Sequence, residues 1–317
     1  MKNRRRKKII FPTIGVAGGV SMLPISATTT GAGQTVTLQR ITPTGCTATV
    51  NWGDGSVSTI ADGNTGTTTH VYAAAGSYTI SIAPPSKLTY IDLRDTKLSF
   101  DSTYLTRCIA LASLRIDIGG KFNSANIAGL PITSLHLSFP VAGTYTFNSA
   151  NISAMALTSL TLSLIVVGTY TFNSSNISTM ALTSLYLYLN DAGTYTFDSA
   201  HIAGMSTITT ITIVLHTTNT FTVAQADWDG FPACGTIRVE AALTQTEVDN
   251  LLLGLWTGFP SKSVSGGTID LLGQSNAAPS GVLQAHCPPT TGYEAAYELV
   301  NDSCDVSTKH YTSATTA

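Results

Sequence analysis

The chain has few charged residues. Only 11% of its 317 residues are Asp, Glu, Lys or Arg, whereas 43% are hydrophobic. Thr, Ser and Gly take the place of the missing charges, and surface helices usually draw on Glu, Lys and Arg. β-Branched and small polar residues favour strands and tight turns instead. The composition therefore predicts a mainly β protein, with room for one large domain or two ordinary ones.

The charges that are present lie unevenly. Six of the 16 basic residues fall between residues 2 and 8, and without them 10 basic against 18 acidic residues give a formal net charge of −8. The remaining chain therefore has no basic face of the kind that nucleic acids require. We expect no nucleic-acid partner.

Residues 1–27 join this basic start to the apolar stretch "IIFPTIGVAGGVSML" and allow three interpretations. They could be a signal peptide that is cleaved after Ala27. They could be an arm that contacts a polyanion, or a solvated end. If the segment is retained, we expect it to serve as an assembly contact or a first strand. No other stretch is apolar and long enough to predict a membrane span.

The sequence also lacks the usual signatures of chemistry. Its five cysteines lack the paired spacing of a metal site, and only Cys287 and Cys304 are placed to form a disulfide. There is no nucleophile elbow, zinc-protease motif, phosphate loop or cofactor fingerprint. We therefore expect no enzyme, no cofactor and no metal. A polysaccharide-cleaving enzyme stays as an alternative, although its paired acids would have to recur between neighbouring repeats, and here they seldom do.

The stretch from Ala48 to Ile82 alternates in short segments separated by turn signals, which predicts a small antiparallel sandwich. It also resembles the PKD-like domains of surface and virion proteins, and this resemblance implies an immunoglobulin-like spacer or interaction module over residues 28–85. The matching residues are Trp52, Gly53-Asp54-Gly55, His70, Tyr72, Gly76, Tyr78 and Thr79.

Two acids of this stretch, Asp54 and Asp62, could together hold a calcium ion. We favour the simpler interpretation, in which Asp54 caps a tight turn through its side chain.

The central part of the chain repeats itself. "GTYTFNSANISAMALTSL" from Gly143 returns as "GTYTFNSSNISTMALTSL" from Gly168. Four phenylalanines, from Phe122 to Phe197, are spaced by 25 residues. A fixed period in the twenties predicts a solenoid, in which each coil buries its apolar face against its neighbours. The expected core columns are Leu105, Ile127, Ile152, Ile177 and Ile202, and Cys108, Leu130, Met155, Met180 and Met205.

Each copy also carries an L-x-x-L-x-L segment, as in Leu157, Leu160 and Leu162. On this period the segment resembles the leucine-rich repeats, and we place the repeats over residues 86–242. The Asn that usually follows the strand occurs only once, as Asn190, and "GTYTF" adds a second alternating segment to each coil. A right-handed parallel β-helix is therefore the rival fold, supported by a column expected to stack amides, namely Asn126, Asn151, Asn176 and His201.

The last repeat needs a capping element, because an open sheet edge would pair with another chain. "LTQTEVDNLLLGLW" predicts a capping helix, with Thr244 and Glu247 as a capping box. We expect this helix and a last strand to fill residues 243–285, followed by an irregular tail over 286–317. This ending resembles that of leucine-rich proteins among phage and bacterial surface proteins.

Residues between the leucines of each L-x-x-L-x-L segment should point outward. Stacked coils would align them in two columns, and aromatic, hydroxyl and guanidinium groups suit recognition of a protein or glycan. We expect Tyr186 and Tyr188 to be the anchor; alternatively, these residues simply suit an exposed strand. The columns are Arg115, His136, Thr161, Tyr186, Thr212 and Arg238, and Asp117, Ser138, Ser163, Tyr188, Val214 and Glu240.

The sequence as a whole predicts a non-enzymatic binding or structural protein exposed outside the cell or on a virion. As a secreted or cell-surface adhesin, or as a virion tail or fibre component, it would bind a host-surface protein or glycan. The alternative is a self-assembling subunit whose partners are other virion or surface subunits.

Overall fold

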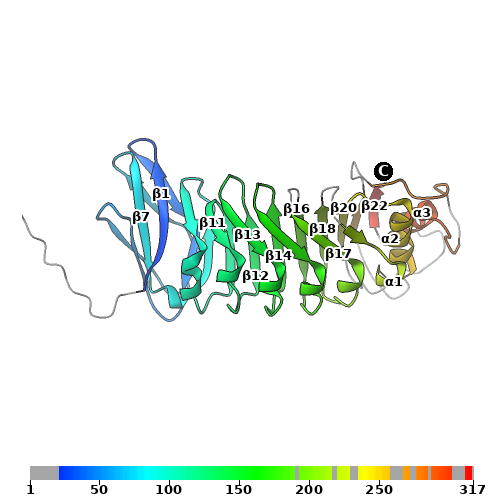
Figure 1. The fold of residues 1–317 in the computed structure, drawn as a ribbon, viewed down its shortest axis with the longest axis horizontal. Coiled ribbons are helices and arrows are strands. Elements are labelled where there is room, and N and C mark those ends of the chain that lie inside the picture. Colours follow the sequence, from blue (N-terminus) through cyan, green and yellow to red (C-terminus); the bar gives the residue numbers. More distant parts are fainter. Residues whose placement is uncertain are drawn as a thin grey trace, which may run out of the picture.

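The computed structural model describes residues 21–189, 193–215, 220–228, 235–257, 267–271, 276–284, 287–301 and 311–315. The molecule is mainly β and elongated, as predicted from composition (Figure 1). An antiparallel sandwich forms one end, strands stacked along the long axis form the middle, and helices pack at the other end.

The sandwich contains seven strands in two layers. β1 pairs with β7, which pairs with β4, and β4 with β5, while β2 pairs with β6, all antiparallel. Alternating burial along β7 and β4 shows why these sequences form strands: one face is apolar and the other polar. The strands are β1 (Leu23–Thr29), β2 (Gln34–Leu38), β3 (Arg40–Pro43), β4 (Ala48–Asn51), β5 (Val57–Ile60), β6 (Thr68–Tyr72) and β7 (Gly76–Ala83).

The first strand corrects the expected domain boundary at residue 28. β1 begins at Leu23, and Leu23, Ile25 and Ala27 are buried in the core. Ala27 itself lies between Tyr78 of β7 and Leu98 of β9. Cleavage after Ala27 would therefore remove five of the seven residues of β1. The position after Ala27 lies inside a strand paired on both sides, which argues against cleavage there.

Two ten-stranded sheets run through the described residues. The first sheet has the order β19-β17-β15-β13-β11-β9-β1-β7-β4-β5, and the second has the order β22-β21-β20-β18-β16-β14-β12-β10-β8-β3. They do not close into a barrel. In the first sheet the repeats contribute β9 (Leu98–Asp101), β11 (Gly119–Asn123), β13 (Thr144–Asn148), β15 (Thr169–Asn173), β17 (Thr194–Asp198) and β19 (Thr220–Thr222).

The L-x-x-L-x-L segments form the second sheet, and each is joined to its strand of the first sheet by a loop. We call one strand from each sheet, together with the 3₁₀ turn that follows, a coil. The strands are β8 (Leu88–Leu93), β10 (Ser113–Asp117), β12 (Ser134–Ser138), β14 (Ser159–Leu164), β16 (Ser184–Leu189), β18 (Thr210–Leu215), β20 (Thr236–Glu240), β21 (Gly267–Asp270) and β22 (Tyr311–Thr315).

A 3₁₀ turn follows most strands of the first sheet. At the start of the turns from η2 to η6, an Asp or Asn side chain accepts a hydrogen bond from the backbone N–H two residues on, as Asn148 does from Ala150. The turns are η1 (Pro85–Lys87), which precedes β8, and η2 (Ser102–Arg107), η3 (Ser124–Asn126), η4 (Ser149–Ile152), η5 (Ser174–Ile177) and η6 (Ser199–His201).

The predicted core columns are confirmed. Their members are buried, and Cys108 lies among them with no exposed surface. Burial raises the pKa of the Cys108 thiol to about 12, so it stays protonated at neutral pH. In the second sheet, equivalent residues of successive copies lie opposite one another, as Leu160 and Leu185 do.

The first sheet follows a different register. Phe147 lies opposite Tyr170, not opposite Phe172, and the strands from β11 to β17 share this offset of two residues against the sequence repeat. At the next strand, β19, the offset is lost, and Phe197 lies opposite Phe221. The tyrosine of "GTYTF" is buried and folds back over the glycine two residues before it. A Cβ on Gly143 would lie 2.4 Å from Cζ of Tyr145. This contact explains why the motif keeps its glycine.

Hydrogen bonds between coils centre on a buried serine that the sequence analysis missed. The expected stack of amides is replaced by bonds from each amide to the serine of the preceding coil: Asn151 Nδ2 lies 2.8 Å from Ser124 Oγ, and Asn176 Nδ2 lies 2.7 Å from Ser149 Oγ. His201 Nδ1 meets Ser174 Oγ at 2.8 Å in the same way. The column is structural, as predicted, but its partner is a hydroxyl group.

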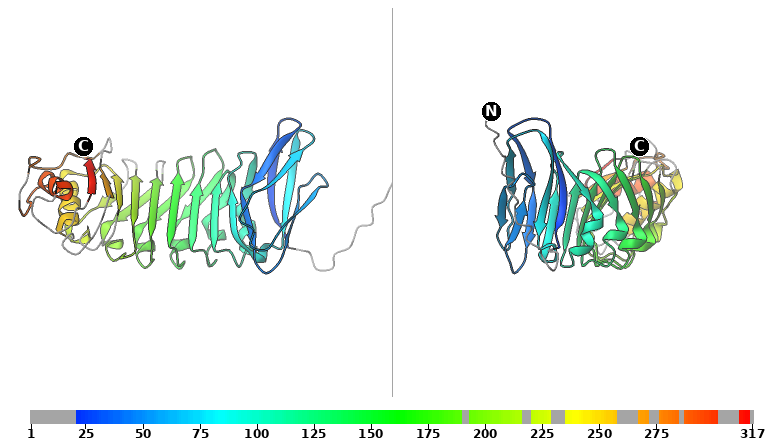
Figure 2. Two further views of the ribbon diagram at one scale, coloured as in Figure 1. Left: turned by 180° about the vertical axis from the view of Figure 1, so that it is seen from behind. Right: turned by 60° about the vertical axis from the view of Figure 1, so that its left-hand side comes forward.

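The sandwich is not a separate spacer. β1 pairs antiparallel with β9 in the first sheet, and β3 pairs antiparallel with β8 in the second. Both sheets therefore continue from the sandwich into the parallel strands, around one hydrophobic core (Figure 2). The sandwich covers the edges that the first coil would otherwise leave open.

In the part of the chain that the structure describes, three helices lie near the other end. In α2, the predicted capping box is confirmed: Thr244 N–H donates to Glu247 Oε2 at 2.9 Å, and Glu247 N–H donates to Thr244 Oγ1 at 3.3 Å. Within the described residues, none of the helices has the length and apolarity needed to span a membrane. The helices are α1 (Gln225–Trp228), α2 (Gln245–Thr257) and α3 (Gly292–Asn301).

The expected irregular tail is wrong. Residues 286–317 contain α3 and also β22, which pairs in parallel with β21 and extends the second sheet. The signal for α3 was present, since Thr291 and Glu294 form another S/T-x-x-E pair, with Glu294 N–H donating to Thr291 Oγ1 at 3.3 Å. Cys287 is disulfide-bonded. Cys304, its expected partner, lies outside the described residues.

Candidate ligand-binding face

The outer face of the second sheet carries the two predicted columns. Across β10, β12, β14, β16, β18 and β20, Arg115 lies opposite His136, and the pairing continues in the same register to Arg238. The second column, from Asp117 to Glu240, is aligned in the same way. β8 adds Asp92 opposite Arg115. The period of two along each strand and the constant copy length made these columns predictable.

Part of this face is hollowed into an open groove of about 470 Å³. The groove brings together seven residues of the two predicted columns and Ser184, which belongs to a third column that the sequence analysis missed. Tyr188, Arg238 and Glu240 do not line it. Its lining residues are Arg115, Asp117, His136, Ser138, Thr161, Ser163, Ser184 and Tyr186.

The charged end of the groove lies on β10, whose neighbour β8 carries Asp92. Arg94 donates to both carboxylate oxygens of Asp92, from Nε and Nη2, at 2.8 Å each. Arg115 Nε lies 3.9 Å from Asp92 Oδ1, which is too far for a hydrogen bond. Asp92 is thus held by Arg94, and the guanidinium of Arg115 remains at the groove.

His136 lies between these charges and the hydroxyl groups. Burial, with the positive charge of Arg115, lowers the pKa of His136 below its usual value of 6.5. The imidazole is therefore neutral at pH 7 and can both donate and accept a hydrogen bond.

The middle of the face is uncharged. Tyr186 exposes 38% of its surface at one end of the groove, next to Thr161 on the neighbouring strand. Tyr188 is half-buried in the second column. An exposed ring beside hydroxyl groups offers one apolar surface and several hydrogen-bonding positions.

At the far end of the face, the charged side chains form ion pairs with one another. Arg238 Nη2 lies 3.5 Å from Glu240 Oε2, and Arg238 Nε lies 3.6 Å from Asp270 Oδ2. Arg238 and Glu240, both predicted for the ligand face, therefore pair with each other outside the groove, and Arg238 pairs with Asp270 as well. They are less available to a ligand than Arg115.

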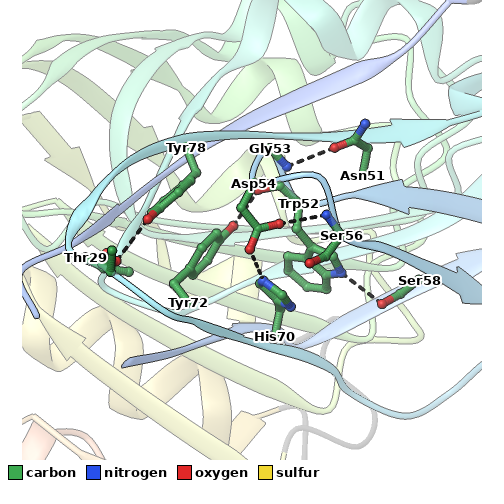
Figure 3. A network of polar contacts seen from close by, with 11 residues as sticks. Thr29, Asn51, Trp52, Gly53, Asp54, Ser56, Ser58, His70, Tyr72 and Tyr78 are labelled. Carbon is green, nitrogen blue, oxygen red and sulfur yellow. Dashed lines mark hydrogen bonds and ion pairs between the residues drawn. The ribbon is translucent and has the colours of Figure 1, made fainter. Parts of the chain in front are cut away.

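The hallmark residues of the sandwich form a second cluster, shown in Figure 3. Trp52 stacks on His70 with ring centroids 5.0 Å apart, and His70 meets the edge of Tyr72 at 4.6 Å. Tyr72 Oη donates to the Trp52 carbonyl at 2.7 Å, and burial raises the pKa of Tyr72 to about 12. Tyr78 stacks on Tyr72 at 4.0 Å. The cluster is packed and hydrogen-bonded as a structural unit.

The calcium interpretation is not supported by this geometry. Asp54 accepts from Ser56 N–H at 2.9 Å and from His70 Nε2 at 2.7 Å, and these bonds hold the pKa of Asp54 below its usual range. Asp62 accepts from Gly45 N–H in a different turn. Among the described residues, no group of three or more His, Cys, Asp or Glu could hold a metal ion. The turn-capping role of Asp54 is confirmed.

This cluster belongs to the part of the chain with a recognisable family. Residues 22–83 match the PKD domain. The match begins one residue before β1, in agreement with the corrected boundary. It covers the sandwich and none of the parallel strands. No curated protein and no solved structure matches the chain significantly.

Proposed function

We propose that the protein is a non-enzymatic binding protein that holds a glycan in the groove on the outer face of the second sheet. The observation that carries this proposal is the groove itself, where hydroxyl groups, an exposed ring, an imidazole and a guanidinium group come together. The parallel strands form a rigid support for them, because each coil packs on the next.

The lining favours a glycan over a protein surface. Ser138, Thr161 and Ser163 supply small hydroxyl groups, and Tyr186 alone supplies an aromatic ring. Protein interfaces are usually centred on several large apolar or aromatic anchors, which this groove lacks among its described lining residues. Polar positions recur at every strand, about 4.8 Å apart, and suit a ligand that is itself built from repeated units.

A binding role is also favoured over cleavage. Glycoside hydrolysis generally needs two carboxyl groups that flank the bond. Of the described residues that line the groove, only Asp117 carries one.

The setting follows from the architecture. The parallel strands have the period and the L-x-x-L-x-L pattern of a leucine-rich-repeat-like solenoid, and we propose that the PKD domain closes its first edge. PKD domains are typically extracellular. We therefore place the protein on a cell surface or on a virion, as an adhesin or a tail or fibre component.

The test is loss of glycan binding after removal of the rings. The variant Tyr186→Ala with Tyr188→Ala should keep the wild-type melting curve and lose at least tenfold in affinity on a glycan array. Arg238→Gln is the matched control, because Arg238 lies on the same face but outside the groove. Unchanged binding by the double variant would exclude the groove as the site.

A self-assembling subunit is the second candidate. Val141 lies in the loop between β12 and β13, and Ile165 and Val167 lie in the equivalent loop of the next coil. All three are exposed, Val167 by 82%. Exposed apolar side chains at equivalent loops would suit a contact with another subunit. Ile165→Ser with Val167→Ser should then reduce the oligomer mass measured by light scattering, and an unchanged mass would exclude these loops.

A further inference from the structure

The guanidinium group of Arg115 has unused hydrogen-bonding capacity at the groove. Its Nε is buried and has no hydrogen-bond partner among the described residues. Burying a charged donor without a partner is costly, and such groups in folded proteins usually bind something. About a third of the side chain, 32%, remains exposed to solvent.

The protein's own acids do not fill this capacity. Asp92, the nearest carboxylate, is held by two hydrogen bonds from Arg94. Asp117 lies two residues further along β10 and forms no ion pair with Arg115 within 4.0 Å. Arg115 therefore forms a long ion pair with Asp92, and its Nε forms no hydrogen bond within the described residues.

The charges around Arg115 are balanced, which leaves the charge of Arg115 itself in excess. Arg94 and Lys97 line a neighbouring groove of about 480 Å³ at the junction with the sandwich. Arg40, opposite Asp92 in the register, lies over the Tyr90 ring with 4.1 Å from its Cζ to the ring centroid. These three cations are matched in number by Asp92, Asp95 and Asp117, so the formal charge of +1 at this end of the chain is that of Arg115.

A guanidinium fork matches the two oxygens of a carboxylate or phosphate group better than it matches a sugar hydroxyl. Tyr186 lies three strands away on β16, which at about 4.8 Å per strand is roughly 14 Å across the face. A ligand that reaches both residues must therefore be a chain with an anionic group at one position and an apolar ring face at another.

We infer that the groove binds an anionic glycan, with a carboxylate or phosphate group on Arg115 and a neutral sugar ring on Tyr186. This inference rests on the proposed glycan-binding function and adds the charge of the ligand. Asp117 opposes the anion and accepts hydrogen bonds from sugar hydroxyl groups. Ser138 and Thr161 lie between the two ends and bind further hydroxyls.

The experiment uses a glycan array that carries neutral, carboxylated and phosphorylated oligosaccharides, followed by calorimetry on the strongest ligand. The wild-type protein should prefer anionic members, and the carboxylated and phosphorylated sets distinguish the two sources of the charge. Arg115→Gln should lose about 10- to 100-fold in affinity, the range for a charge-assisted hydrogen-bonded contact. Arg115→Lys should recover part of it, since lysine keeps the charge without the fork.

Two variants sharpen the result. Asp117→Asn removes the opposing charge and should strengthen binding of the anionic ligand severalfold. Arg238→Gln, outside the groove, should leave it unchanged. Melting curves of all variants establish that they are folded.

The outcomes separate the inference from the proposed function. Equal binding of neutral and anionic glycans, or undiminished binding by a folded Arg115→Gln variant, would overturn the anionic subsite and leave glycan binding in place. No binding to any member of the array would overturn both.

Discussion

The side-chain amide of Asn176 donates a hydrogen bond to the hydroxyl of Ser149 in the preceding coil, with 2.7 Å between Nδ2 and Oγ. The same oxygen accepts from the backbone N–H of Asn173 at 2.9 Å and donates to its carbonyl at 3.4 Å. Ser149 has no exposed surface. One small buried group therefore ties two coils together at three points, and equivalent serines repeat this along the molecule.

Replacing this serine should destabilise the protein out of proportion to its size. Ser149→Ala leaves the Asn173 N–H and the Asn176 amide without their acceptor, and we expect a loss of about 1–3 kcal/mol in the free energy of unfolding. Urea denaturation measures it. Ser178→Ala is the control, because the exposed Ser178 hydroxyl bonds only within its own turn, to Ser175 O at 2.8 Å. Equal losses in both variants would show that the buried serine has no special role.

The core columns can be tested with a charge. Ile177 is fully buried, and Ile177→Asp would place an unpaired carboxylate inside the stack. We expect loss of cooperative unfolding, or a melting temperature too low to measure. Ser178→Asp, one residue later and exposed, should stay close to wild type. A wild-type melting curve for Ile177→Asp would contradict the register of the repeats.

The sequence was most informative where local pattern and packing agree. The outward columns of the second sheet could be predicted because strand alternation fixes which residues point outward, and a constant copy length fixes which residues align. Arg115, His136 and Tyr186 accordingly lie where the pattern puts them. That seven residues of these columns share a groove could not be predicted, because a hollow depends on the relative sizes of neighbouring side chains.

The misses have physical causes as well. The two-residue offset that places Phe147 opposite Tyr170 depends on how the coil is wound, and no single copy encodes it. The buried serines looked like ordinary turn residues, because Ser is common at the surface. The alternation of Leu23, Ile25 and Ala27 lies in the segment for which a signal peptide and a first strand were both open, and only the pairing with β7 and β9 identifies it as β1.

The turn of the sandwich offers a matched pair of glycines. Gly53 and Gly55 both have positive φ, 85° and 98°. A Cβ on Gly53 would lie 2.7 Å from the Thr79 carbonyl oxygen, whereas nothing lies within 4 Å of one on Gly55. Gly55→Ala should therefore cost about 1–2 kcal/mol from backbone strain alone, and Gly53→Ala clearly more. Chemical denaturation of both variants measures the difference in their free energies of unfolding. Equal losses would mean that the β7 backbone shifts to make room for the added methyl group.

The start of the folded chain can be fixed by truncation. A chain that begins at Met22 keeps all of β1 and should melt as the full-length protein does, whereas a chain that begins at residue 28 loses Leu23 and Ile25. Both side chains are buried, and removing a large core side chain costs about 2–5 kcal/mol. The two losses together are comparable with the whole stability of an ordinary domain, about 5–15 kcal/mol.

Because β1 also pairs with β9, the loss should spread from the sandwich into the first coil. We therefore expect the shorter chain to be insoluble or to unfold without cooperativity. A soluble shorter chain with the wild-type melting curve, or an intact mass from the native source that begins at residue 28, would show that β1 is dispensable and would restore Ala27 as a cleavage position.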